Sequence, residues 1–261
     1  MFGVVPKAIW NKTNPADENN MCTWAMRCLL VEDGDRLILI DTGIGNKQDQ
    51  KFFSYYYLHG DANMDKSLAT KGFHRDDITD VFLTHLHFDH VGGAVIRDGE
   101  KLVPAFKNAT YWSNENHWEW AVNPNEREKA SFLKENILPI QESGQLKFAG
   151  DDGVQFTQDF SIKFAYGHTE AMMLPLINYK GKQVLYMADL LPSVGHLPMP
   201  YVMAYDMFPL KTLTEKKIVL TEALEKEYIL YLEHDPINEC CTLQQTEKGI
   251  RLGDTFKLSE L

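Results

Sequence analysis

The stretch Val81-Phe82-Leu83-Thr84-His85-Leu86-His87-Phe88-Asp89-His90 joins a short apolar run to three imidazoles and a carboxylate. The apolar run is typical of a buried strand, so the polar cluster lies where that strand ends. One residue separates His85 from His87, and in an extended chain side chains at this spacing point the same way. Imidazole and carboxylate are ligands that zinc and its divalent neighbours prefer. The stretch therefore predicts a metal site at the end of a buried strand.

The same stretch suits two metal ions better than one. Asp89 and His90 are adjacent, and adjacent side chains diverge in an extended chain. They point the same way only where the chain turns, and Gly92-Gly93 provides a place for a turn. We expect His85 and His87 on a first ion and Asp89 and His90 on a second. The alternative is a chance cluster of solvated histidines, which fits poorly because the chain has only 9 His in 261 residues.

Composition allows an enzyme of ordinary size. With 261 residues, 44% of them hydrophobic, the chain can form one large domain or two fused halves. The net charge of −11 opposes a polyanion, so we expect no nucleic-acid partner. No stretch is long and apolar enough to span a bilayer, so we also expect no membrane partner. The four cysteines form no CxxC pair and indicate no disulfide framework, and the cytoplasm is the expected location.

Strands and helices alternate along the first half. Two apolar-rich runs at 27–32 and 36–41 flank Asp33-Gly34, which predicts a β-hairpin. Residues 66–71 are expected to form a short helix that Gly72 ends. Between the hairpin and this helix, the aromatic residues at 52–57 form either a lid or a helix face packed on the core. The same residues offer a surface for a homodimer contact.

A further helix is expected to begin at Asn123-Pro124. Asn123 is a suitable cap, Pro124 fits a first turn, and Glu126 completes a capping box. Short strands at 101–103 and 110–112 precede this helix. Its core positions would be Ala130, Leu133 and Ile137, and Pro139 would stop it.

In the second half, from about residue 151, strands and helices alternate as they do in the first half, about 1–150. Strands are expected at 145–148, 154–156, 160–166, 172–179, 183–187 and 228–232, with a helix at 215–226 capped by Thr212. His168, Asp189 and His234 stand where three of these strands end. Alone, each is typical of a solvated or capping residue. Together they complete two ligand sets: His168 joins the first ion, His234 the second, and Asp189 bridges both.

With these residues in view, the chain resembles the metallo-β-lactamase superfamily. His85-x-His87-x-Asp89-His90, Gly167-His168-Thr169, Asp189 and Glu233-His234-Asp235 match the metal motifs of that family in order and spacing. Asp41-Thr42-Gly43 matches its early loop, where the Asp supports the ligands from behind. The resemblance covers the chain as a single domain, 1–261, and implies an α/β fold of the αβ/βα type: a four-layer sandwich of two mixed sheets flanked by helices. It also implies a dinuclear hydrolase centre that usually holds zinc.

Departures from the family patterns narrow the choice of branch. β-Lactam hydrolases of the main class have Cys where Asp189 stands, and flavodiiron proteins replace His87 and His90. Glyoxalase II enzymes add a domain after the last His, and phosphodiesterase branches need basic surface. What remains resembles the branch that opens N-acyl homoserine lactones, together with its organophosphate-hydrolysing relatives.

One catalytic residue of that branch is missing. The lactonases it resembles have a Tyr three residues after the bridging Asp, and here that position is Pro192. His196, Tyr201 or Tyr205 could replace it, although a surface role for His196 is an equal alternative. The N-terminus also departs from the family pattern, because family members usually have another strand before the position where this sequence starts. The true gene is therefore expected to begin further upstream.

The resemblance and the ligands predict a dinuclear hydrolase. Two divalent ions about 3.5–4 Å apart make a hydroxide from a shared water, which would attack a lactone or ester carbonyl. We expect Asp89, Asp189, His196 and Tyr201 to take part, with zinc as the metal and iron, manganese or cobalt as alternatives. Residues able to enclose an acyl tail, with core packing as the alternative role of each, are Met21, Trp24, Phe53, Phe106, Met172 and Met199. A phosphotriester or phosphodiester hydrolase and a non-enzymatic metal-binding protein are the other interpretations.

Overall fold

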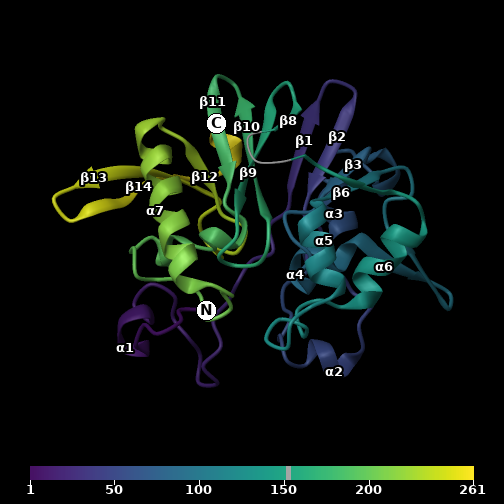
Figure 1. Ribbon diagram of the computed structural model, residues 1–261, viewed down its shortest axis with the longest axis horizontal. Helices are drawn as coiled ribbons and strands as arrows, with labels where there is room; N and C mark the ends of the chain where they lie inside the picture. The colour runs from purple at the N-terminus through teal and green to yellow at the C-terminus, as the bar shows by residue number, and fades with distance from the viewer. Residues whose placement is uncertain (151–153) are drawn as a thin grey trace. The chain divides into compact units, whose positions relative to one another are not determined.

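The computed structural model describes residues 1–150 and 154–261 (Figure 1). The chain divides into two compact units. The middle unit comprises Cys28–Ala149, and the terminal unit comprises Met1–Arg27 together with Gly150–Leu261. The first residues of the chain therefore belong with its second half. That all 261 residues act as a single domain stays a prediction.

The middle unit is built on a five-stranded sheet with the order β1-β2-β3-β6-β7. Strands β1 and β2 form the predicted hairpin, with Leu29 opposite Ile40 and Asp33 opposite Arg36. Gly34 turns the chain with a φ of +60°, which favours glycine. The pairs β2–β3, β3–β6 and β6–β7 are parallel. Because parallel strands run the same way, the chain leaves β2 and β3 at the same edge of the sheet.

The remaining elements of this unit are two short hairpin strands, five helices and two 3-10 turns. The bounds are β1 (Leu29–Asp33), β2 (Arg36–Ile40), α2 (Gln50–Phe53), α3 (Met64–Ala69), η1 (Arg75–Asp77), β3 (Asp80–Phe82), α4 (Phe88–Val91), η2 (Gly92–Ala94), β4 (Val95–Asp98), β5 (Lys101–Pro104), β6 (Thr110–Ser113), α5 (Glu115–Val122), α6 (Lys134–Glu142) and β7 (Leu146–Phe148).

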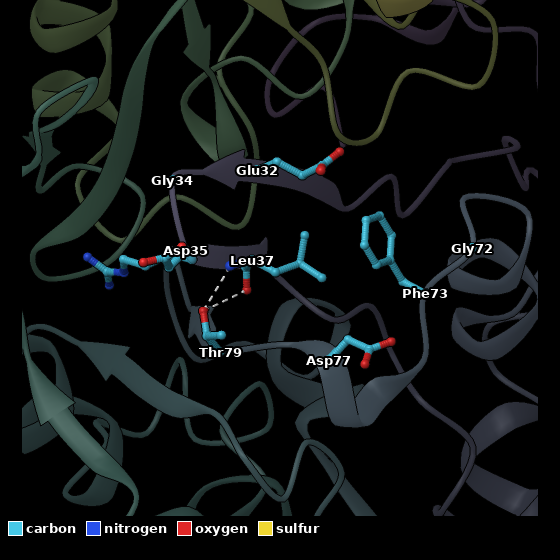
Figure 2. Close-up of a pocket in the computed structure, with 9 residues that line it drawn as sticks. Glu32, Gly34, Asp35, Leu37, Gly72, Phe73, Asp77 and Thr79 are labelled. Atoms are coloured by element: carbon cyan, nitrogen blue, oxygen red, sulfur yellow. Dashed lines mark hydrogen bonds between the residues drawn. The ribbon is translucent and has the colours of Figure 1, made fainter.

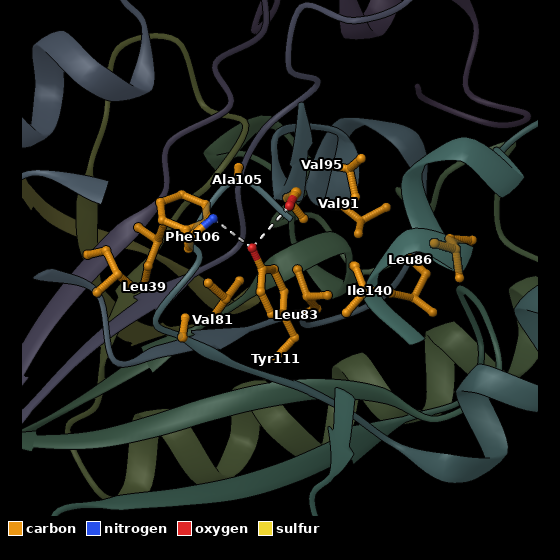
Figure 3. Packing of buried hydrophobic residues seen from close by; sticks show 14 of the residues in the cluster. Leu39, Val81, Leu83, Leu86, Val91, Val95, Ala105, Phe106, Tyr111 and Ile140 are labelled. Atoms are coloured by element: carbon orange, nitrogen blue, oxygen red, sulfur yellow. Dashed lines mark hydrogen bonds between the residues drawn. The ribbon is translucent and has the colours of Figure 1, made fainter. Parts of the chain in front are cut away.

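Apolar side chains from these elements form a buried core (Figure 3). Leu83 and Leu86, which flank Thr84 and His85 in the motif, are both fully buried in it. Burial of each leucine contributes about 2 kcal/mol. The Tyr111 hydroxyl accepts a hydrogen bond from the Phe106 N–H at 2.9 Å and donates one to the Ala94 carbonyl at 3.1 Å. The core thus fixes the backbone from which the imidazoles project.

The helix predicted to start at Asn123 is wrong. Asn123 instead follows the last residue of α5, and α6 begins only at Lys134 and contains Pro139. The Asn125 side chain accepts hydrogen bonds from the N–H groups of Arg127 and Glu128, and so holds a turn where a helix was expected. Ala130, expected in the core, is exposed, whereas Ile137 is buried as predicted.

The terminal unit is built on a seven-stranded sheet with the order β14-β13-β12-β11-β10-β9-β8. Strands β11 and β12 are parallel and the other pairs are antiparallel. The bounds are α1 (Lys7–Trp10), β8 (Gln155–Thr157), β9 (Phe160–Ala165), β10 (Met172–Tyr179), β11 (Lys182–Tyr186), η3 (Ala188–Leu190), η4 (Val194–His196), α7 (Pro209–Glu225), β12 (Ile229–Tyr231), β13 (Cys240–Thr246), β14 (Gly249–Phe256) and η5 (Leu258–Glu260).

Helix α7 packs against β13 and β14, two strands that the sequence did not predict. The helix begins at Pro209, with Phe208 before it, so Thr212 lies inside the helix and the predicted cap at Thr212 is wrong. Proline fits this first position because its missing N–H would have no partner there. Strand β7, expected in the second half, pairs with β6 in the middle unit.

Both units combine a sheet of mixed strand direction with helices, which confirms the predicted mixed α/β class. Within residues 1–150 and 154–261, no helix has the length and apolar character needed to cross a membrane.

Candidate metal centre

Asp41 anchors the predicted metal motif where β2 ends. Its φ of +56° turns the chain, and its N–H donates to the Phe82 carbonyl at 2.9 Å. Its carboxylate accepts hydrogen bonds from the N–H of Thr84 at 2.8 Å and from its hydroxyl at 2.6 Å. These bonds fix the residue that precedes His85, in agreement with the supporting role expected for Asp41.

His85 and His87 converge, as their spacing predicted. Nε2 of His85 lies 3.1 Å from Nδ1 of His87. On its far side, the His87 ring donates from Nε2 to the Glu128 carboxylate at 2.9 Å. The N–H of Leu86, between them, donates to Nε2 of His117 at 2.8 Å. The two predicted ligand atoms therefore face each other from a rigid backbone.

The turn that carries Asp89 and His90 is the short helix α4. Nδ1 of His90 lies 3.1 Å from the Asp41 carboxylate, and its Nε2 lies 3.9 Å from Oδ1 of Asp89. His90 is fully buried, whereas the Asp89 side chain is 32% exposed. A close backbone approach holds the turn: a Cβ on Gly92 would lie 2.1 Å from the carbonyl oxygen of Ile44. Glycine is therefore required at the end of α4, near the place where the sequence predicted a turn.

In the terminal unit, His168 is held by a carboxylate on each side. Its Nδ1 lies 2.9 Å from Oδ1 of Asp206, and its Nε2 lies 3.1 Å from Oδ2 of Asp189. Burial alone would lower the pKa of His168, but these two carboxylates raise the pKa to about 10. Both carboxylates therefore favour the protonated form of the His168 ring.

Asp189 faces two imidazoles at once. It follows β11, directly after Ala188, whose φ of +40° is a strained value for a residue with a Cβ. Its Oδ2 faces His168, and its Oδ1 lies 2.9 Å from Nε2 of His234. Nδ1 of His234 donates to the Ala25 carbonyl at 2.7 Å. Each oxygen of the Asp189 carboxylate is thus directed at a different imidazole.

The five predicted histidine ligands share one arrangement, seen separately in each unit. One ring nitrogen is held by an oxygen, and the opposite nitrogen faces another predicted ligand of the same unit. The oxygen partners belong to Thr84 for His85, Glu128 for His87, Asp41 for His90, Asp206 for His168 and Ala25 for His234. Fixing the ring and its tautomer in this way is typical of metal-binding histidines. The mixed imidazole and carboxylate groups are of the kinds that could hold a metal ion.

Sequence reasoning missed three of these supporting residues. Glu128, Asp206 and His117 are each about 1% exposed, and each contacts the motif residues or His168. None lies in a motif or at a regular spacing from a ligand. Glu128 lies in the charged run Glu126-Arg127-Glu128-Lys129, so its neighbours in the sequence give no signal of burial.

The three residues expected to replace the lactonase tyrosine, His196, Tyr201 and Tyr205, lie in different environments. His196 is about 1% exposed, its ring stacks on Phe2 with centroids 4.3 Å apart, and its Nδ1 lies 2.8 Å from the Ser193 hydroxyl. Burial lowers the pKa of His196 to about 3, so the ring is neutral. This placement favours a structural role for His196. Tyr201 is partly buried, and the Tyr205 side chain is exposed.

The residues expected to enclose an acyl tail also separate into two groups. Phe106 and Met172 are fully buried in the cores of their units, which confirms the alternative of core packing for both. Partly exposed side chains are Met21, Trp24, Phe53 and Met199.

The aromatic segment at 52–57 contacts the metal motif. The Phe88 ring, between His87 and Asp89, contacts the rings of Phe52 and Tyr56 at centroid distances of 5.4 and 4.9 Å. Tyr55 and Tyr57 are more than half exposed, so a helix face packed on the core is wrong for them. A lid role for the segment stays a prediction.

An open surface hollow of about 430 Å³ lies elsewhere in the middle unit, beside the turn of the β1–β2 hairpin (Figure 2). The Thr79 hydroxyl, which lines it, accepts from the Leu37 N–H at 2.9 Å. None of the predicted metal ligands lines this hollow. We therefore base the functional assignment on the ligand geometry.

Comparison with known families agrees with this geometry. The family model described as "Metallo-beta-lactamase superfamily" matches residues 27–234, which include all seven predicted ligands. The chain belongs to this superfamily. Membership supports a metal-dependent hydrolase. No curated protein matches the chain significantly by sequence.

Solved structures of similar fold include a probable metal-dependent hydrolase from Staphylococcus aureus, with 25% sequence identity and a TM-score of 0.89 over 98% of this chain and 90% of that one. The dizinc quorum-quenching lactonase AidC, in complex with the product N-hexanoyl-L-homoserine, is 24% identical with a TM-score of 0.74, over 90% of this chain and 81% of that one. A B. thuringiensis AiiA variant with bound N-decanoyl-L-homoserine is 20% identical with a TM-score of 0.65, over 87% and 88%. These two lactonases show similarity of fold.

Proposed function

We propose that the protein is a hydrolase that binds two divalent metal ions and opens an ester or lactone bond. The observation that carries the proposal is the placement of Asp189, whose two oxygens face His168 and His234 separately. A single ion would need only one of these oxygens. A carboxylate held between two imidazoles suits a pair of ions that share it.

The proposed ligand sets follow the motif. His85, His87 and His168 hold the first ion, Asp89, His90 and His234 hold the second, and Asp189 bridges both. Zinc fits this mixture of imidazole and carboxylate, and iron, manganese or cobalt could replace it. The oxygen partners of the imidazoles support the proposal, since they direct one nitrogen of each ring toward another ligand.

When bound, the two ions lower the pKa of a shared water and polarise the carbonyl of the substrate. The residues of this chain supply the fixed geometry. Glu128 and Asp206 hold His87 and His168 in position, so the ligands need little rearrangement during the reaction. Asp189 is placed to hold the attacking oxygen and to accept its proton. Asp89, partly exposed, lies at the accessible side of α4.

The substrate we favour is an N-acyl homoserine lactone. AidC and AiiA are lactonases of the same fold. The rings of Phe52 and Tyr56, which contact Phe88, offer apolar surface beside the motif. Pro192, where the lactonases that the chain resembles have Tyr, favours a second candidate, a phosphotriester. Such a substrate is uncharged, so the net charge of −11 does not oppose it.

The test is acid release from N-acyl homoserine lactones of short, medium and long acyl chains by zinc-loaded protein, beside a neutral phosphotriester. Asp189→Asn serves as the blank, and Asp61→Asn, whose side chain is 99% exposed, serves as the matched control. We expect lactone opening that Asp189→Asn abolishes and Asp61→Asn retains. Turnover of the phosphotriester alone would show that the substrate is a phosphotriester and not a lactone. Turnover of neither would contradict the proposed ester chemistry.

A further inference from the structure

The segment that follows Asp189 has few hydrogen-bond donors of its own. Between η4 and α7 it includes Leu197-Pro198-Met199-Pro200-Tyr201. Pro198 and Pro200 have no N–H, so the carbonyls of this segment outnumber its donors. The Tyr201 N–H donates to the Pro198 carbonyl at 2.9 Å and the Val202 N–H to the Pro200 carbonyl at 3.1 Å, and these two bonds do not involve the carbonyls of His196, Met199 and Tyr201. Donors must therefore come from another element.

Lys216 of helix α7 supplies them. Its ammonium donates to the carbonyls of Pro198, Met199 and Tyr201 at 2.9, 3.4 and 3.1 Å, and also to that of His196. The residue is fully buried, on the helix face that also buries Val219, Leu220 and Ala223. A lysine at a core position of an amphipathic helix breaks the pattern expected there. Four carbonyl oxygens around one cation form a cage of the kind that binds a monovalent metal ion.

The C-terminal end of this segment is tied to the predicted ligand His168 of the same unit. It begins at η4, seven residues after Asp189, and ends at Asp206, whose Oδ1 holds His168 and whose Oδ2 accepts from the Met203 N–H at 3.0 Å. Beyond Asp206, the Met207 N–H donates to the carbonyl of His168 at 3.0 Å. A change in the shape of the segment would therefore move the group that orients His168.

We propose that Lys216 is a positioning residue: a cation tethered to α7 that fills a carbonyl cage and so holds residues 196–206 in the shape that keeps Asp206 on His168. The inference rests on the proposed function only for the metal at His168. The cage itself is independent of that function. Burial lowers the pKa of Lys216 to about 7, against the opposing effect of Asp206, so the ammonium is the main form below pH 7.

The experiment compares Lys216→Ala, Lys216→Met and Lys217→Met below pH 7. Lys217, the next residue of α7, is exposed and serves as the matched control. The first readout is the rate of proteolytic cleavage within 196–206, mapped by mass spectrometry. The second is zinc affinity from competition with a chelator. For both Lys216 variants we expect cleavage about tenfold faster and zinc affinity about tenfold weaker than for the control.

Chemical rescue separates a cation cage from simple packing. Methylammonium restores slow cleavage to Lys216→Ala, because its three N–H groups can enter the space left by the lysine head group. Tetramethylammonium, which has the same charge and no N–H donor, does not. Slow cleavage and full zinc affinity in Lys216→Met would overturn the inference, since an apolar side chain of similar length would then suffice. Equal rescue by both ions would also overturn it.

If neither Lys216 variant folds, the same pair of ions is added during refolding. A higher yield of folded Lys216→Ala with methylammonium than with tetramethylammonium supports the cage, and equal yields contradict it. A protein that shows the cleavage and rescue pattern but hydrolyses no ester would refute the proposed function while leaving this inference intact.

Discussion

Replacing Glu128 by Gln tests how the chain prepares His87 for a metal ion. Oε1 of Glu128 faces Nε2 of His87, while Oε2 accepts from the Trp120 indole at 2.6 Å and from the Asn125 amide at 3.2 Å. A glutamine can keep both of the latter bonds only by directing its NH₂ at His87. Nε2 of His87 must then accept a hydrogen bond, which places the ring hydrogen on Nδ1. That atom lies 3.1 Å from Nε2 of His85, where the metal is proposed to bind.

The size of the effect follows from this exchange. The protein exchanges a hydrogen bond to a buried carboxylate, which contributes about 1.5–3 kcal/mol to the free energy of unfolding, for one between neutral groups, which contributes about 0.5–1.5 kcal/mol, so it loses about 1–1.5 kcal/mol. Loss of such a partner typically weakens metal binding by about 10- to 100-fold. This factor corresponds to about 1.4–2.8 kcal/mol of binding free energy. We expect both losses in Glu128→Gln.

The assay is zinc competition with a chromophoric chelator at neutral pH, combined with urea unfolding of the metal-free protein. Glu126→Gln is the control, because the Glu126 side chain is 89% exposed and pairs with Lys129 at the surface. Zinc affinity in Glu128→Gln equal to that of the control would refute the argument that Glu128 sets the tautomer of His87.

Three further changes test local features. Ala188→Gly, at a φ of +40°, should relieve strain and raise the free energy of unfolding by about 0.5–1 kcal/mol in urea, and a fall would contradict this. Gly92→Ala would place a Cβ 2.1 Å from the Ile44 carbonyl oxygen, so we expect unfolding to become easier by about 1–3 kcal/mol, and wild-type stability would speak against the close approach. Burial raises the pKa of Glu222, but hydrogen bonds from Lys163 and its neighbours lower it to about 2, so Glu222 stabilises the fold above about pH 4.5 and loses this effect as the pH falls toward 2. Acid unfolding of Glu222→Gln should therefore show a shallower pH dependence than the wild type in that range, and an unchanged pH profile would exclude the effect.

The features that could be predicted from the sequence are those that depend on residues close together in the chain. The hairpin was predictable because residues with turn preference separate two apolar runs, although the turn consists of Gly34-Asp35, one residue later than the predicted Asp33-Gly34. The convergence of His85 and His87 followed from the two-residue period of an extended chain. Which residues bind the metal stays a proposal, whereas the superfamily is shown by the match over residues 27–234.

The wrong helix at 123–139 shows where such rules fail. Asn123, Pro124 and Glu126 satisfy the helix-start pattern, but the Asn125 side chain binds the backbone N–H groups that a helix would use differently. The resulting turn places Glu128 against His87. A competing local hydrogen bond, selected by a distant contact, therefore overrode the helix pattern.

Partners distant in the sequence could not be predicted from one chain. Glu128 and Asp206 lie 41 and 38 residues from the imidazoles that they hold, and Lys216 lies 15 to 20 residues from the carbonyls that it binds. No periodicity links residues at these separations. Their roles depend on the fold and become visible only in the structure.

The most direct test of the central claim is a zinc titration of metal-free protein, in which bound zinc and ester hydrolysis are measured in the same samples. The account predicts two zinc ions per chain, with activity that reaches its plateau as the second ion binds, and fewer bound ions with no activity in Asp189→Asn. Full hydrolysis by metal-free protein, or a plateau with a single ion bound, would contradict it.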